Sequence, residues 1–127
     1  MACVFCERLT AGDLLCENEA AAAFLDVFPL SPGHALIVPK RHEPDFLRLT
    51  GDEGAAVWRL LGPVRDFLDG RFRPGGYNLG VNVGADAGQT VDHAHLHVIP
   101  RYAGDVPEPR GGIRWIIPAK ARYWVER

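Results

Sequence analysis

The sequence predicts one α+β domain, built mainly from antiparallel strands and one long helix. Three observations carry this prediction. Short apolar segments of strand-like composition recur along the chain, one longer segment has helical periodicity, and a histidine-rich segment alternates with the period of a strand. The 127 residues suffice to bury about two thirds of the surface of the unfolded chain, so a core can form without disulfides. We therefore expect residues 1–127 to form a single domain.

The first part of the chain predicts three strands. Segments 14–17 and 20–25 are short and apolar, and Asn18-Glu19 between them is expected to turn a hairpin. The four consecutive alanines favour a helix by intrinsic propensity, but the segment is short and continues into aromatic and branched residues, so we predict a strand. Segment 34–39 follows a loop rich in proline and has a β-branched, apolar centre, which predicts the third strand.

Residues 50–70 predict the main helix. Thr50 and Glu53 have the spacing of a capping box. Apolar residues then recur at intervals of three and four, as expected for one buried helix face. These residues are Ala56, Val57, Leu60, Leu61, Val64, Phe67 and Leu68. Pro63 lies inside the pattern, so we expect a kink or a break there.

The rest of the chain predicts further strands. Residues 77–83 alternate apolar and small or polar side chains, and a tight glycine-containing loop follows them. Residues 93–100 form the histidine-rich strand, and residues 113–117 are expected to add another strand.

His93, His95 and His97 would project from one face of their strand, because side chains alternate between the two faces, and the apolar residues between them would enter the core. A single histidine in a strand is usually a hydrogen-bonded core residue. Three in strict alternation instead indicate a reactive, metal-binding or anion-binding surface.

Composition excludes several classes of partner. The formal net charge is −2, so the chain lacks the positive charge by which proteins bind nucleic acid without specificity. No apolar run approaches the ~20 residues needed to span a bilayer, and the N-terminus does not resemble a signal peptide. We therefore expect a cytoplasmic protein that binds neither nucleic acid nor membranes. There, Cys3, Cys6 and Cys16 are better explained as metal ligands, redox groups or buried thiols than as disulfides.

The histidine surface admits metal binding, phosphate binding and nucleophilic catalysis. Alternating histidines on a strand are frequent zinc ligands, although no acidic ligand follows the motif. The preceding Gly88-Gln89-Thr90 favours phosphate, because glycine lets the backbone approach an anion and the other two residues offer donors. Imidazole is also partly neutral near pH 7, which suits a nucleophile. The residues alone leave these alternatives open.

Residues 88–101, with the sequence GQTVDHAHLHVIPR, resemble the signature of the histidine triad (HIT) superfamily of nucleotide hydrolases and transferases. Residues 24–27 and 32–42 resemble a second block of the family, and Asn82 also matches. The resemblance implies a histidine-triad fold. This is an antiparallel sheet of about five strands with one main helix and a short helix, paired in a two-fold dimer across the main helix and an edge strand.

The resemblance also implies roles for single residues. His95 matches the nucleophile that attacks the α-phosphorus of a nucleoside phosphate and forms a nucleotidyl-histidine. His97 matches the residue that binds the α-phosphate and assists the leaving group, so these two are the expected catalytic residues. The residues that match nucleotide contacts are Phe5, Phe24 and Val27 at the base, Asp26 at the ribose, Asn82, Gly88, Gln89 and Thr90 near the phosphates, and His34 beside the histidines.

Cys3 and Cys6 have C-x-x-C spacing, which alone is weak evidence for zinc. Many members of the family pair such cysteines with two histidines, which here would be His42 and His93. The resemblance therefore implies a closed Cys₂His₂ site for a structural zinc ion. Catalysis would need no metal from the protein, because it depends on positioning and charge neutralisation.

The third histidine of the motif separates the hydrolases from transferases that carry Gln there, so His97 favours hydrolysis of purine nucleotide conjugates at the α-phosphate. Diadenosine polyphosphates and nucleoside phosphoramidates are the two competing substrate classes, and residues 100–105 resemble the dinucleotide branch. The alternatives are a nucleotide-binding or scaffolding module with little activity, a nucleotidyltransferase, and a metal hydrolase. Residues 103–127 form a tail that would contribute to the active site or to the dimer.

Overall fold

The computed structural model describes residues 2–124 and confirms the predicted α+β class with a five-stranded antiparallel sheet. The strand order is β1-β2-β3-β5-β4. The strands are β1 Cys16–Glu17, β2 Ala21–Leu25, β3 Ala35–Pro39, β4 Gly76–Gly80 and β5 Leu96–Arg101. The helices are α1 Val4–Ala11, α2 Gly51–Arg59, α3 Leu61–Phe72 and α4 Pro118–Ala121, with short 3-10 helices η1 Phe46–Arg48, η2 Ala85–Ala87 and η3 Gly112–Ile116. Among the described residues, no helix combines the length and apolarity needed to cross a membrane.

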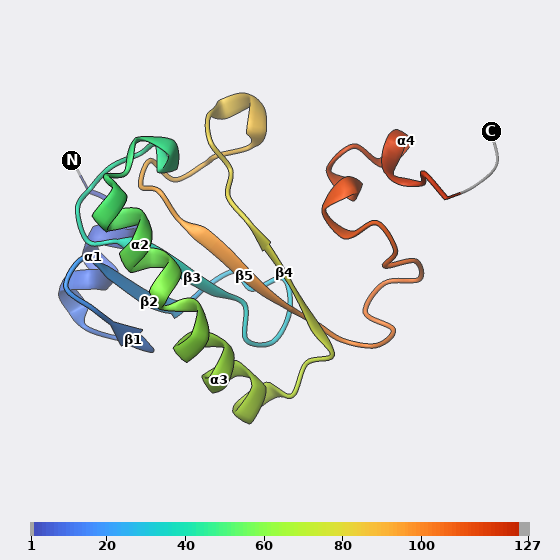
Figure 1. Ribbon diagram of the computed structural model, residues 1–127, viewed down its shortest axis with the longest axis horizontal. Helices are drawn as coiled ribbons and strands as arrows, with labels where there is room; N and C mark the ends of the chain where they lie inside the picture. Colours follow the sequence, from blue (N-terminus) through green and yellow to red (C-terminus); the bar gives the residue numbers. More distant parts are fainter. Residues whose placement is uncertain (1, 125–127) are drawn as a thin grey trace.

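The helices α2 and α3 cover one face of the sheet, and Figure 1 shows them in front of the strands, one continuing the other. The core between this face and the helices is made of small and aliphatic side chains. Its buried members are Ala21, Ala23, Ala35, Ile37, Ala56, Val57, Leu60, Val64, Leu68, Leu96 and Val98. Each large side chain buried here contributes roughly 1.5–3 kcal/mol to folding, so this cluster is the main source of stability.

In the part of the chain that the structure describes, α1 and η3 lie over the two ends of the opposite face of the sheet, which we call the open face. At one end α1 packs Phe5 against Phe24, Leu36 and Val38. At the other end η3 lies on β4, where a Cβ on Gly80 would lie 3.8 Å from Ile113 Cδ1. Figure 1 shows this C-terminal segment, in orange to red, beyond the β4 side of the sheet and away from α1. His97 lies on β5 between these two covers, and His95 lies just before the start of this strand.

The capping box at the start of α2 is confirmed. The Glu53 N–H donates to Thr50 Oγ1 at 3.1 Å, and the Thr50 N–H donates to Glu53 Oε1 at 2.9 Å. The expected break is also present, but it falls at Leu60 rather than at Pro63. Pro63 occupies the first turn of α3, where a backbone N–H has no intrahelical partner to lose.

The start of the histidine strand is a correction. Strand β5 begins at Leu96, so of the three histidines only His97 lies within the strand. The register that pairs Ile37 with Leu96 would next bring Pro39 opposite Ala94. Proline has no N–H to donate to that ladder, and the Ala94 N–H instead donates to Glu43 O at 2.7 Å.

Two further segments differ from prediction. The strand expected over residues 77–83 ends at Gly80. The strand expected over residues 113–117 is wrong, because η3 and α4 occupy this region. Gly111 and Gly112 have φ of +95° and +47°, which turn the chain before it could extend, and Pro118 starts α4.

Candidate active site

His34 and His97 form a hydrogen-bonded pair on the open face of the sheet. The Leu30 N–H donates to His34 Nδ1 at 3.0 Å, so the proton of this buried ring is on Nε2. His34 Nε2 lies 3.0 Å from His97 Nδ1 and therefore donates to it. The remaining ring nitrogen of a neutral His97, Nε2, then carries a proton. His97 thus offers an N–H donor on the open face.

His95 has the opposite arrangement of its proton. Its Nδ1 lies 2.8 Å from the carbonyl oxygen of His93 and must donate to it, which leaves the lone pair on Nε2. The ring is 6% exposed and stands edge-on to Phe5 and to His97, with ring centroids 5.0 Å apart in both pairs. A nitrogen with a free lone pair therefore lies next to an N–H donor, which is the pairing that a nucleophile and a phosphate-binding group require.

Burial keeps the rings of His34 and His97 neutral. It lowers the pKa of His97 to about 4, assisted by the neighbouring His95 and His34 and opposed by Asp26. Burial also lowers the pKa of His34, again opposed by Asp26. Both rings are neutral at pH 7, as the chain of hydrogen bonds from Leu30 to His97 requires.

Asp26 lies beside His34 at the end of β2. Its Oδ2 is 3.6 Å from His34 Nε2, and its Oδ1 accepts the Phe28 N–H at 2.9 Å. Asp26, His34 and His97 each offer an atom that could coordinate a cation, and these atoms lie within 4.8 Å of one another. If the protein were a metal hydrolase, Asp26, His34 and His97 could hold its metal ion.

The three residues expected at a base pocket have different environments. Phe24 is fully buried, with the Arg8 guanidinium 4.3 Å from the centre of its ring. Phe5 is 8% exposed and packs against Phe24, with ring centroids 5.5 Å apart. Val27 is 66% exposed. Of the three, Phe5 lies directly beside the ring of His95.

The residues expected near the phosphates lie in the loop before the histidines. The Gln89 side chain is held by the backbone. It accepts from the Gly84 N–H at 2.9 Å and donates to Pro44 O at 2.7 Å and to Val91 O at 3.1 Å. Gln89 therefore shapes the loop. Gly88 is exposed with φ of +92°, and Asn82 is half-buried.

Thr90 is exposed and borders a different hollow from the one expected. It lines a cavity of about 230 Å³ together with Cys3 and His42.

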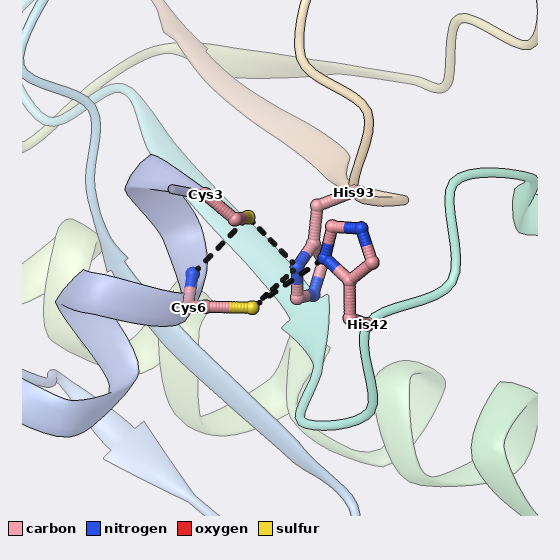
Figure 2. A group of neighbouring side chains, drawn as sticks. All are labelled: Cys3, Cys6, His42 and His93. Carbon is pink, nitrogen blue, oxygen red and sulfur yellow. Dashed lines mark hydrogen bonds between the residues drawn. The ribbon is translucent and has the colours of Figure 1, made fainter. Parts of the chain in front are cut away.

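Cys3, Cys6, His42 and His93 converge on one point (Figure 2). The cysteines come from the start of α1, His42 from the loop after β3, and His93 from the segment before β5. Their sulfur and nitrogen atoms all lie within 4.8 Å of one another. Three segments that are distant in the sequence thus meet at one group of donors, which could bind a metal ion.

The donor set fits a tetrahedral zinc ion. His93 Nδ1 lies 3.4 Å from Cys3 Sγ and 3.5 Å from Cys6 Sγ, and His42 Nδ1 lies 3.5 Å from Cys6 Sγ. Zinc–sulfur bonds of ~2.3 Å and zinc–nitrogen bonds of ~2.1 Å at tetrahedral angles place the two donors about 3.6 Å apart. His93 Nε2 donates to Pro39 O at 2.8 Å, so its Nδ1 lone pair is directed at the cysteines.

Backbone groups that sequence reasoning missed determine the state of each ring. The Leu30 N–H orients His34, the His93 carbonyl orients His95, and the Pro39 carbonyl orients His93. A backbone atom carries no signal of residue type.

The fold and these two clusters define a small α+β protein in which one histidine-rich segment contributes both to a set of paired imidazoles and to a group of side chains that could bind a metal ion. A model of the HIT domain matches residues 9–104, and the chain belongs to this family. The five-stranded antiparallel sheet and the helices expected for a single chain of this fold are confirmed.

Two relatives from Schizosaccharomyces pombe are named for enzyme activities. The chain is 38% identical to the bis(5'-nucleosyl)-tetraphosphatase (asymmetrical) of this yeast over 91 residues. The aligned region covers 72% of this chain and 50% of that protein. The chain is 37% identical over 105 residues to the adenosine 5'-monophosphoramidase hnt1 of the same yeast, covering 80% of this chain and 75% of that protein. A crystal structure of a HIT family protein from Bacillus anthracis superimposes with a TM-score of 0.75 at 36% identity, covering 81% of this chain and 75% of that one.

Proposed function

We propose that the protein is a nucleotide hydrolase that cleaves purine nucleotide conjugates at the α-phosphate through a nucleotidyl-histidine on His95. The observation that carries the proposal is the 2.8 Å hydrogen bond from His95 Nδ1 to the His93 carbonyl, because it directs the lone pair to Nε2. Membership of the HIT family and the two hydrolase-named relatives support the reaction class.

The reaction would take two displacements at one phosphorus atom. His95 Nε2 attacks the α-phosphorus, the bond from phosphorus to the leaving group breaks, and the leaving group keeps the electron pair and takes up a proton. Water next attacks the same phosphorus and loses a proton to solvent, the electron pair of the phosphorus–nitrogen bond returns to His95 Nε2, and a nucleoside monophosphate departs. The His93 carbonyl stabilises the positive charge that develops on the His95 ring while Nε2 is bonded to phosphorus.

His97 would act as a hydrogen-bond donor in this scheme. Because His34 donates to its Nδ1, a neutral His97 presents the Nε2 proton to an α-phosphate oxygen or to the leaving group. Its pKa of about 4 means that the ring is neutral at pH 7 before a substrate binds. His34 would be a positioning residue, since it acts through His97.

The nucleoside would lie at the α1 end of the open face. Phe5 beside His95 would border the base together with Phe24 and Val27, and Asp26 would accept from the ribose hydroxyls. Residues Asn82, Gly88 and Thr90 would provide the phosphate side, with Gln89 holding their loop in shape. A homodimer that binds purine nucleotides is part of the same proposal.

We also infer that Cys3, Cys6, His42 and His93 hold a structural zinc ion. Burial and the neighbouring Cys3 raise the pKa of the Cys6 thiol, whereas a bound divalent cation would keep it deprotonated. With four protein donors no coordination position is left for substrate, so such a site would stabilise the fold.

A panel of substrates tests the proposed function. The protein is incubated with adenosine and guanosine phosphoramidates and with dinucleoside polyphosphates, and the products are separated and identified. Release of a nucleoside monophosphate is the expected result. Binding without turnover would favour the nucleotide-binding module, and transfer of the nucleotidyl group to a sugar phosphate in preference to water would favour the nucleotidyltransferase.

A further inference from the structure

We propose that the C-terminal segment, residues 106–122, builds a pocket beside His97 that takes the second nucleoside of a dinucleoside polyphosphate. This inference rests on the proposed function and deepens it, because it assigns the departing half of the substrate to a place on the protein. The segment and the loop before β3 enclose a cavity of about 640 Å³, which lies within the ~300–1,000 Å³ typical of ligand pockets.

The cavity lies on the same face of the sheet as the catalytic histidines. Side chains alternate along β5, and the partners of the helix-facing core are Leu96 and Val98, so His97 and Arg101 both project from the open face. Arg101 lines the cavity. On the neighbouring strand, Gly80 pairs with His97 and presents no side chain, and Ile113 Cδ1 lies 3.8 Å from where a Cβ on Gly80 would be, so the C-terminal segment lies over the strand position beside His97.

The loop before β3 connects the cavity wall to the histidine pair directly. Leu30 and Ser31 both line the cavity. The N–H of Leu30 donates to His34 Nδ1 at 3.0 Å, and Ser31 Oγ donates to the carbonyl of Pro100 on β5 at 2.7 Å. The wall is therefore fixed to the same residues that position His97.

The lining suits a planar ring with polar edges. Trp115 forms one side, and its indole N–H donates to Arg110 O at 2.8 Å, which fixes the ring. The Arg122 guanidinium lies 5.9 Å from the centre of a Trp115 ring. The exposed Leu30 side chain adds apolar surface on the opposite wall. A nucleobase can stack on such an aromatic surface whatever its identity, since every base has a π-face.

The polar end of the cavity is close to neutral. Asp105 accepts from Arg101 Nε at 2.7 Å and from its Nη2 at 2.8 Å, and Asn78 Oδ1 accepts from Nη1 at 2.6 Å. This ion pair leaves little unbalanced charge, so the end of the cavity suits the uncharged hydroxyl and amine groups of a nucleoside. The negatively charged end of a polyphosphate would bind there less favourably than a nucleoside, because the charge of Arg101 is already balanced by Asp105.

The distance selects between the two substrate classes. Arg101 lies four positions after His97 on β5, which corresponds to about 13 Å along a strand. The amine of a simple phosphoramidate is bonded directly to the α-phosphorus and stays beside His97. A dinucleoside polyphosphate places several phosphates between the reacting atom and its second nucleoside, which can reach this far.

Steady-state kinetics of Trp115→Ala test the pocket. Diadenosine tetraphosphate and adenosine 5'-phosphoramidate are compared as substrates, because only the first carries a second nucleoside. We expect kcat/KM to fall about tenfold for the dinucleotide, mainly through a higher KM, and to change less than about twofold for the phosphoramidate. Trp115→Phe keeps a ring and should recover most of the loss, which separates stacking from a disturbed C-terminal segment.

Trp58→Ala is the matched control, since Trp58 is 64% exposed on α2 on the other side of the sheet. It should leave both substrates unaffected. Equal losses on both substrates with Trp115→Ala, or no loss on either, would overturn the pocket while the phosphoramidate activity still supports the proposed function. A wild-type protein that hydrolyses the phosphoramidate and not the dinucleotide would overturn it too. Hydrolysis of neither substrate would overturn the proposed function together with the pocket.

Discussion

The carbonyl oxygen of His93 accepts the Nδ1 proton of His95 at 2.8 Å, so the backbone of one histidine fixes the ring of the next histidine in the sequence. The ring of His93 itself points the other way, to Cys3 and Cys6 at 3.4 and 3.5 Å. One residue therefore belongs to the cysteine cluster through its side chain and to the candidate active site through its backbone. A disturbance of the cysteine cluster should therefore shift the His93 backbone and change the orientation of the His95 ring.

Removal of the His95 ring should abolish turnover. The variant His95→Ala retains His34 and His97, so nucleotide binding is expected to survive while kcat falls by more than about a thousandfold. Single-turnover product analysis and equilibrium binding of a nucleoside monophosphate measure the two effects separately. Full activity in this variant would exclude the nucleotidyl-histidine mechanism.

The strands and the main helix could be predicted because their patterns are local. The capping box at Thr50 and the apolar period after it specify α2 and α3. The alanines of β2 favour a helix by propensity, yet they form a strand because each is fully buried in the pairing with β3, with Ala21 and Ala23 packed in the core beneath α2. The tail could not be predicted, since an apolar segment after two glycines fits a strand as well as the short helices observed.

The candidate site could be predicted by residue type but not by proton position. Alternation brought His95 and His97 together, and the C-x-x-C spacing identified the cysteines that converge on His93. The tautomers of His34 and His95 depend on the Leu30 N–H and on the His93 carbonyl, and these contacts exist only after the chain has folded. The start of β5 at Leu96 likewise depends on where Pro39 lies in the neighbouring strand.

Gly33 should not tolerate a side chain. Its φ is +89°, and a Cβ there would lie 2.8 Å from Phe72 Cδ2, so strain and a clash with α3 act together. We expect Gly33→Ala to lower the free energy of unfolding by about 2–4 kcal/mol, measured by urea denaturation. Gly12→Ala is the control, because Gly12 also has a positive φ, of +77°, but open space around it. Equal losses in the two variants would show that the contact with Phe72 is unimportant.

The ion pair of Arg41 and Glu53 predicts a pH-dependent stability. Arg41, assisted by the Thr50 N–H, lowers the pKa of Glu53 from 4.5 to about 2. The folded protein therefore binds fewer protons than the unfolded chain between these values, so the stabilisation is complete above pH 4.5 and is lost as the pH falls towards 2. The side chain of Arg41 is 49% exposed, so solvent screening limits the contribution to about 1 kcal/mol.

The variant Glu53→Gln isolates this effect, because glutamine retains the capping box and removes the charge. The difference in unfolding free energy between wild type and variant should be largest near pH 6 and shrink towards pH 2. Other carboxylates titrate in both proteins and cancel in the difference. A difference that does not change with pH would contradict the role of the charge.

The cysteine cluster makes the last prediction, which concerns metal removal. Elemental analysis should find about one zinc per chain in the purified protein, and Cys6→Ser should lose it. Because ligands from α1, the loop after β3 and the segment before β5 meet there, dialysis against a chelator should lower the melting temperature and the activity together. Cys16→Ser is the control, since Cys16 lies on β1 outside the cluster, and it should keep the metal. If chelation instead abolished activity with an unchanged melting temperature, a catalytic ion at Asp26, His34 and His97 would replace the structural one, and the role assigned to His95 would fall with it.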